Sequence, residues 1–142
     1  MQREIKHQFT FPQPKEVVWD HLTTTELLAQ WLMPNDFQPI VGHKFTLQTR
    51  PKTKFAFDGI IYCEVIEIIP YKKLVYSWRG GMSKKNPSLD SVVTWTLTET
   101  DKGTTLFLEH KGFKGIKNYM AYVIMNMGWA KIGKRLFKNL NS

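Results

Sequence analysis

The sequence predicts an α+β fold in which a long C-terminal helix lies across a curved antiparallel sheet. Residues 3–11 and most of residues 43–110 alternate apolar and polar side chains, which is typical of strands with one buried face. Two short segments after residue 13 and one long segment after residue 115 have helical spacing instead. The 142 residues contain no repeat, low-complexity tract or linker, so a single domain over residues 1–142 is expected.

The N-terminal part is expected to hold one strand and two short helices. The strand covers residues 3–11, and its apolar face carries Ile5, His7, Phe9 and Phe11. Pro14 suits the first position of a helix, because the N–H that proline lacks is not needed there, so a helix is expected over residues 14–23. A second short helix ends at Pro34, and its apolar face carries Leu28, Trp31 and Leu32.

Five more strands are expected, which makes six in all. They cover residues 43–49, 55–69, 74–78, 93–97 and 106–110. Short turns at residues 70–73 and 100–103 predict antiparallel pairing of the strands that they join.

Two irregular places are expected in this sheet. A long loop is predicted from Gly80 to Asp90, because this stretch contains Asn86-Pro87. The stretch 55–69 is long and apolar on both faces, so Gly59 is expected to allow a bulge or a sharp bend that curves the sheet.

The last segment predicts the longest helix of the chain. Its apolar residues fall within a narrow arc at spacings of four, three, four and four: Met125, Trp129, Ile132, Leu136 and Leu140. The opposite side is basic and carries Lys131, Lys134, Arg135 and Lys138. We interpret one face as packed on the sheet and the other as solvated, near a C-terminus whose dipole favours cations.

Composition excludes some classes of function. A formal net charge of +8 favours approach to a polyanion without specifying one, so we expect no specific nucleic-acid partner. The single cysteine, Cys63, cannot form an internal disulfide and suits a reducing compartment, so a cytoplasmic location is expected. No stretch approaches the roughly 20 apolar residues that cross a bilayer, and no secretory segment is expected.

Several motifs follow one another in an order that resembles a known family. They are Val18-Trp19-Asp20-His21-Leu22, residues 28–34, Val41-Gly42, residues 64–70, residues 74–78, Gly103-Thr104-Thr105, residues 110–113 and Gly128-Trp129. Together they resemble the SRPBCC (START-like) superfamily, in its branch related to the C-terminal domain of the heat-shock chaperone ATPase activator (AHSA-type). The resemblance spans nearly the whole chain and departs at His43 and Cys63, where the family more often has glycine.

This resemblance implies a helix-grip fold with a cavity between the long helix and the sheet, which relatives use for lipids, hormones or polyketides. We expect the pocket to be lined by side chains from the concave face of the sheet and from the contact between helix and sheet. They are Trp31, Phe45, Leu47, Ile61, Trp78, Trp95, Leu108, His110, Met125 and Trp129. The alternative is that these side chains fill a core and leave no cavity.

Three functions stay open at this point. The first is binding of a small apolar ligand, and the second is an interaction module that stimulates a heat-shock chaperone ATPase. The third, a polyketide cyclase-like enzyme, needs paired titratable groups facing the cavity. Asp58 and Glu64 lie on a cavity-forming strand, but solvated carboxylates are the more frequent outcome. The oligomeric state stays open.

No catalytic, metal or cofactor site is predicted. The four histidines are scattered and no Cys or His cluster has the spacing of metal ligands. Cys63 has no local signature of a nucleophile and is interpreted as a buried thiol. His7, His43 and His110 fall on the apolar faces of their strands, where a neutral imidazole needs a hydrogen-bonding partner. His110 is the histidine most worth testing, because it lies within a motif of the family.

Overall fold

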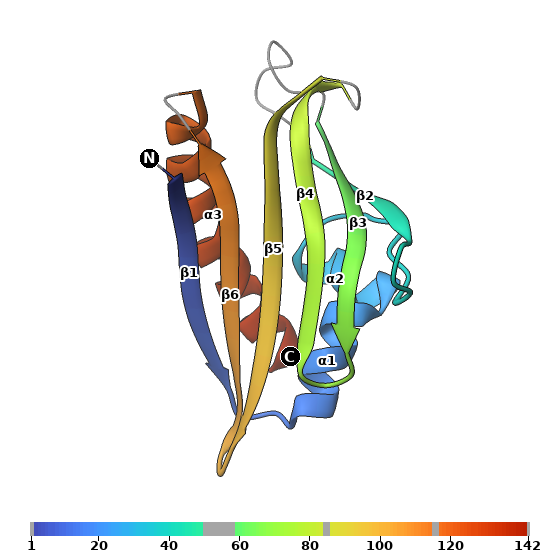
Figure 1. The fold of residues 1–142 in the computed structure, drawn as a ribbon. Coiled ribbons are helices and arrows are strands. Elements are labelled where there is room, and N and C mark those ends of the chain that lie inside the picture. Colours follow the sequence, from blue (N-terminus) through green and yellow to red (C-terminus); the bar gives the residue numbers. More distant parts are fainter. Residues whose placement is uncertain (1, 50–58, 84–85, 115–116, 142) are drawn as a thin grey trace.

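A computed structural model describes residues 2–49, 59–83, 86–114 and 117–141 (Figure 1). The strands described form one antiparallel sheet in the order β1-β6-β5-β4-β3-β2. They are β1 (Gln2–Phe11), β2 (Lys44–Gln48), β3 (Ile60–Ile69), β4 (Lys73–Ser83), β5 (Asn86–Thr100) and β6 (Gly103–Lys114). The helices are α1 (Lys15–Thr23), α2 (Thr25–Trp31) and α3 (Lys117–Leu140). The predicted α+β, helix-grip class is confirmed.

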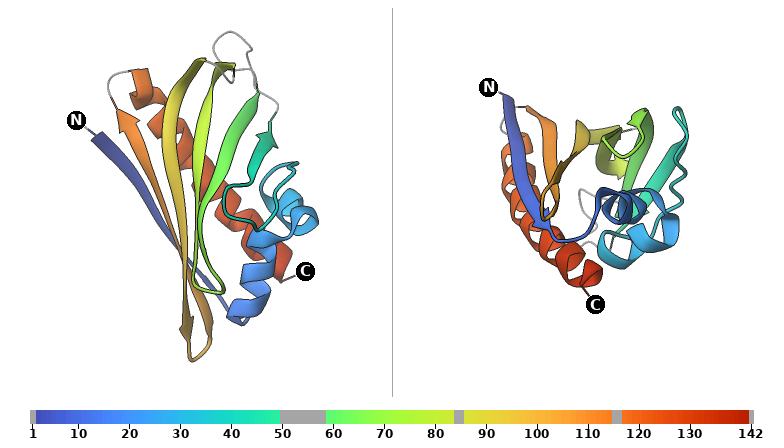
Figure 2. Two further views of the ribbon diagram at one scale, coloured as in Figure 1. Left: turned by 45° about the vertical axis from the view of Figure 1, so that its right-hand side comes forward. Right: turned by 90° about the horizontal axis from the view of Figure 1, so that it is seen from below.

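The sheet is curved, and the helices lie on its inner side. Seen from below in Figure 2, the strands follow an open curve, with α3 along the β1 side and α1 and α2 towards the β2 side. Helix α3 contacts β1, β6 and β5 of the sheet and also α2. The N-terminal strand β1 lies at one edge and pairs with β6, the last strand in the sequence. Among the described residues, no helix combines the length and hydropathy that a membrane span requires.

Alternation along the strands places the core between the sheet and α3. In β4 and β5 the inward side chains are fully or nearly fully buried: Leu74, Tyr76 and Trp78, and Val93, Trp95 and Leu97. Helix α3 buries Trp129, Ile132 and Leu136 against them, and its exposed basic side chains include Lys131, Lys134, Arg135 and Lys138. The predicted division of this helix into a packed face and a solvated face therefore describes the structure.

The predicted loop from Gly80 to Asp90 is wrong. Strands β4 and β5 continue through it, with Gly80 opposite Leu89 and Ser83 opposite Asn86, so that only residues 84 and 85 lie between the strands. The register shifts on either side of Gly81, which is opposite Pro87. Such irregularities let a proline enter a sheet, because its missing N–H then breaks no regular ladder bond.

Other boundaries also differ from the predictions: α2 ends at Trp31 rather than at Pro34, and β5 and β6 extend beyond the predicted ranges 93–97 and 106–110. Strand β3 begins at Ile60 rather than at residue 55; residues 55–58 lie outside the described residues. Gly59 precedes this strand with φ of 86°, and the register shift lies further along, between Val65 and Glu67. Helix α1 begins at Lys15, one residue later than expected, because Pro14 takes the extended N-cap position.

Candidate functional site

Four tryptophans form a continuous aromatic layer under α3. Trp31 of α2 meets Trp95 of β5 edge to face, with 5.9 Å between ring centroids. Trp95 meets Trp129 of α3 at 5.5 Å, and Trp129 meets Trp78 of β4 at 5.2 Å. Such ring pairs add about 0.5–1.5 kcal/mol each beyond their buried area. The layer therefore joins α2, the middle of the sheet and α3 into one packed unit.

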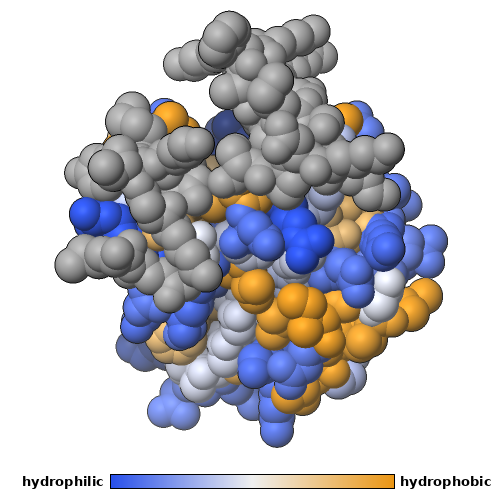
Figure 3. Space-filling model, turned by 45° about the horizontal axis from the view of Figure 1, so that its top comes forward, coloured by the Kyte–Doolittle hydropathy of each residue, from blue (hydrophilic) through white to orange (hydrophobic). Residues whose placement is uncertain are grey.

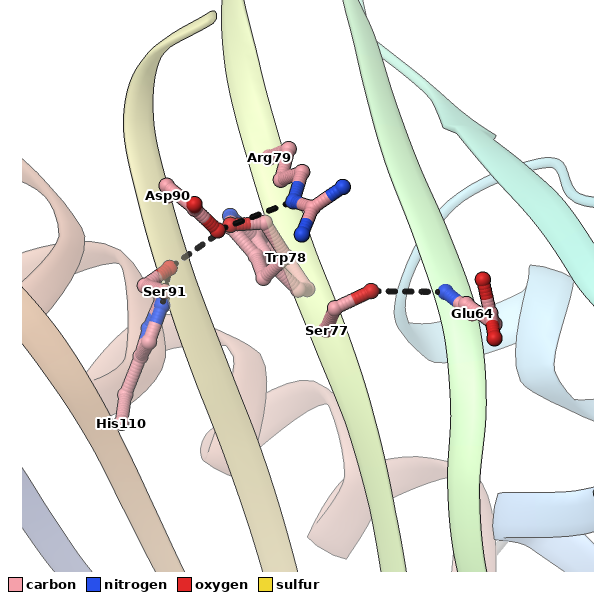
Figure 4. Close-up of polar contacts among 7 residues, drawn as sticks. All are labelled: Glu64, Ser77, Trp78, Arg79, Asp90, Ser91 and His110. Atoms are coloured by element: carbon pink, nitrogen blue, oxygen red, sulfur yellow. Dashed lines mark hydrogen bonds and ion pairs between the residues drawn. The ribbon is translucent and has the colours of Figure 1, made fainter. Parts of the chain in front are cut away.

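A buried chain of hydrogen bonds runs through this layer and fixes its protonation. Trp129 Nε1–H donates to His110 Nδ1 at 3.0 Å, and because an indole nitrogen can only donate, Nδ1 must be the acceptor. His110 Nε2 therefore carries the proton and donates to Ser91 Oγ at 2.8 Å. Ser91 Oγ–H in turn donates to the Trp78 carbonyl at 2.7 Å, as Figure 4 shows.

His110 is consequently a neutral, structural donor and acceptor. Its side chain is fully buried, and burial lowers the pKa of His110 from 6.5 to about 3. A proton on Nδ1 would also point directly at the Trp129 N–H and break the bond that ties α3 to β6. The rings packed around His110 in the described structure, those of Trp78, Phe113 and Trp129, carry no charge.

Of two further indole donors in this layer, Trp95 has a hydrogen-bond acceptor and Trp78 has none among the described residues. Trp95 Nε1–H donates to the Tyr76 hydroxyl at 2.8 Å, and burial raises the pKa of Tyr76, so the phenol stays protonated. Trp78 Nε1 is buried without a hydrogen-bond acceptor among the described residues. Trp78 Nε1 is thus an unpaired donor among the described side chains of the inner face, which the sequence pattern does not reveal.

An open cleft lies next to the layer, between α2, the end of β2 and α3. Its volume is about 760 Å³. The described residues that line it are Ala29, Gln30, Trp31, Leu32, Met33, Pro34, Gln48, Thr49, Gly128, Lys131, Ile132 and Arg135. A hydrogen bond of 2.9 Å from Asn139 Nδ2 to Gln30 Oε1 links α3 to α2 beside it. We call this space the α2–α3 cleft.

Sequence comparison then identifies the family. The chain matches, over residues 12–141, the family described as activator of Hsp90 ATPase homolog 1-like protein. The chain belongs to this family. The AHSA1-like match covers most of the chain, including every described residue that lines the α2–α3 cleft. No match was found among curated proteins.

Solved structures support the same assignment for this AHSA1-like chain. Protein MLL2253 from Mesorhizobium loti is 35% identical, with a TM-score of 0.85, over 98% of this chain and 97% of the other. Protein BH1534 from Bacillus halodurans is 26% identical, with a TM-score of 0.77, over 99% of each chain. CalU16 from Micromonospora echinospora, 22% identical with a TM-score of 0.77 over 98% of this chain and 76% of the other, shares the fold.

The structure of this AHSA1-like chain brings most of the predicted pocket residues together, but in the interior. Nine of the ten are exposed by 5% or less: Trp31, Phe45, Leu47, Ile61, Trp78, Trp95, Leu108, His110 and Trp129. Met125 is partly buried and packs against them. Of the ten, Trp31 lines the α2–α3 cleft. Contact of this set with a ligand stays a prediction.

Sequence reasoning missed most of the lining of the α2–α3 cleft in this AHSA1-like chain. Leu32 and Met33 follow α2, and Ile132 was assigned only to the packed face of the helix. Lys131 and Arg135 were interpreted as a solvated stripe, although both border the cleft. The sequence gives one partial signal, because the two cations are four residues apart and so lie about one turn apart on the same side of the helix.

The other histidines and Cys63 of this AHSA1-like chain have partners or are buried. His7 Nε2 lies 2.9 Å from Asn126 Oδ1 of α3, and His43 Nε2 lies 2.9 Å from the Asp36 carbonyl oxygen. Burial raises the pKa of the Cys63 thiol, so it stays protonated. No group of three possible metal ligands occurs among the described residues.

The outer face of the sheet carries a second, smaller hollow of about 280 Å³ over β2, β3 and β4. Its polar contacts run along the sheet: the Glu64 N–H donates to Ser77 Oγ at 2.9 Å, and Arg79 pairs with Asp90 at 2.9 Å (Figure 4). Glu64 is exposed, and Asp58 lies outside the described residues. Figure 3 shows hydrophobic side chains gathered on part of the surface among hydrophilic ones. Glu64 therefore contributes no carboxylate to the described lining of the α2–α3 cleft.

Proposed function

We propose that this chain binds a small hydrophobic molecule in the α2–α3 cleft. The supporting observation is the cleft itself, whose volume of about 760 Å³ falls within the roughly 300–1,000 Å³ of small-molecule sites. Its floor is apolar and includes Trp31, Leu32 and Ile132. Burial of a ligand against this floor stabilises the complex by about 25 cal/mol per Å² of apolar surface removed from water.

Catalysis has less support in the same place. Cyclase or hydrolase chemistry requires a titratable acid and base that face the substrate. The described lining of the cleft has no carboxylate and no histidine, and its charged groups are Lys131 and Arg135. The proposed role is therefore binding, with selectivity set by the shape of the cleft.

Gly128 offers a direct test, because it lines the cleft and a Cβ added there meets no atom within 4 Å. Gly128→Phe is expected to fill the cleft without disturbing the core and to reduce ligand affinity at least tenfold. Gly128→Ala is the matched control: it leaves the cleft open and raises the free energy of unfolding by about 0.5–1 kcal/mol through helix propensity.

The measurement is a thermal-shift screen of fatty acids, polyketides and aromatic metabolites, followed by calorimetric titration of the best compound. Wild type and Gly128→Ala are expected to bind it alike. The proposal is contradicted if no apolar compound stabilises the protein, or if Gly128→Phe binds as tightly as wild type.

A second candidate function is stimulation of a heat-shock chaperone ATPase, which the family description and the surface of α3 favour. The side chains of Ile124 and Met127 are 62% and 60% exposed. They lie on the same helix as the exposed Lys134 and Lys138. Titration of Hsp90 tests it: a salt-sensitive complex and faster ATP turnover are expected. Lack of association at low ionic strength would exclude this function.

A further inference from the structure

The positive charge of the chain is concentrated in its last segment. Residues 1–109 contain 13 Lys and Arg and all 12 Asp and Glu, whereas residues 110–142 contain seven Lys and Arg and no acidic residue. The last 33 residues therefore carry seven of the eight net charges. This segment is mainly α3, the helix that forms one side of the α2–α3 cleft.

Two of these cations stand at the rim of the cleft. Lys131 and Arg135 are separated by four residues, so they lie on one side of α3, about one turn apart. Both side chains are exposed, and neither forms an ion pair with an acid among the described residues. The polar side chains that share the lining are neutral: Gln30, Gln48 and Thr49.

The dipole of the helix does not account for this pair. Its influence is confined to the last turn, where Lys138 lies. Lys131 precedes Leu140, the end of α3, by nine residues, which corresponds to about 13 Å along the axis. The charge at the end of the helix therefore does not explain the two rim cations.

We propose that the ligand of the α2–α3 cleft is an amphipathic carboxylic acid. Its carboxylate pairs with Arg135 and Lys131 at the rim, and its apolar body packs against the apolar lining residues Trp31, Leu32 and Ile132. The planar fork of Arg135 binds a carboxylate with two parallel hydrogen bonds, and Lys131 adds a point charge. This assignment rests on the proposed function and adds the chemical class of the ligand to it.

The test compares two probes that differ only in the head group, dodecanoate and dodecan-1-ol, by calorimetric titration below their aggregation concentrations. Wild type is expected to bind dodecanoate about tenfold more tightly, because one charge-assisted contact contributes about 1.4 kcal/mol or more. Arg135→Gln and Lys131→Gln are expected to remove this preference, so that each variant binds dodecanoate no more tightly than dodecan-1-ol. Lys138→Gln removes the same charge away from the described cleft lining and is expected to preserve it.

The outcomes separate this inference from the proposed function. Equal binding of the two probes, or an equal loss in Lys138→Gln and Arg135→Gln, overturns the carboxylate assignment and leaves a hydrophobic ligand site in place. Failure of both probes to bind, with no other apolar compound stabilising the protein, overturns both proposals.

Discussion

Lowering the pH from 8 to 5 is expected to reduce the free energy of unfolding by about 2 kcal/mol through His110 alone. Burial lowers the pKa of His110 from 6.5 to about 3, so the unfolded chain takes up a proton before the folded chain does. The stabilising contribution is complete above pH 6.5 and is lost progressively as the pH falls from there towards 3. The Trp129 N–H, which points at Nδ1, opposes any earlier protonation in the folded state.

Urea unfolding of wild type and of His110→Gln between pH 5 and 8 measures this effect. The two proteins differ only at position 110, so the difference between the two pH profiles isolates His110. Equal pH dependence of the two proteins would contradict the prediction. Nitrogen chemical shifts of the wild-type imidazole at pH 5 provide a second measurement that does not require the variant to fold. A neutral ring with its proton on Nε2 is expected, and a doubly protonated ring would refute the assigned hydrogen-bond chain.

Gly133→Ala is expected to lower the free energy of unfolding by about 1–3 kcal/mol, although alanine favours helices more than glycine does. A Cβ at this position overlaps the ring of Phe9, where α3 lies against β1. Either the ring or the helix must move. The resulting loss of packing between α3 and the edge strand exceeds the gain of about 1 kcal/mol in helix propensity.

The control is Gly128→Ala, five residues earlier on the same helix, where the same substitution meets open space. Thermal or urea unfolding is expected to give opposite signs for the two variants. A double-mutant cycle with Phe9→Ala should restore much of the loss in Gly133→Ala, because the overlap is removed. If Gly133→Ala is as stable as Gly128→Ala, the prediction is wrong, because the Phe9 ring then moves aside at little cost.

The fold could be predicted to a large extent because burial imposes a period on each element. The alternation in β1 and the spacing of Trp129 and Leu136 in α3 both follow from one face that meets the core. The hairpin of β4 and β5 could not be predicted in the same way. Two glycines and Asn86-Pro87 favour a loop locally, but pairing between the strands accommodates them through register shifts.

The lining of the candidate site was harder to predict than the fold. It comes from two helices, a strand end and a connection, and no single spacing of apolar residues relates these segments. Alternation correctly placed His110 on an inward face, yet it does not reveal that Trp129 of α3 supplies its donor. Met33 lies in the connection after α2, where no periodicity applies. Lys131 and Arg135 gain their significance only from the cleft beside them. Aromatic residues predicted the region of the core and not the lining of the cleft.

The pairing of β1 with β6 has a consequence for the order of assembly. Gln2 is opposite Lys114 and Phe11 is opposite Thr104, so every bond of this ladder closes a loop of about 90 residues or more. During synthesis β1 stays without this partner until β6, which begins about 90 residues after β1 ends, has been made. Its exposed edge is then a template for wrong pairing between nascent chains, and translation that stops before β6 would leave that hazard permanent.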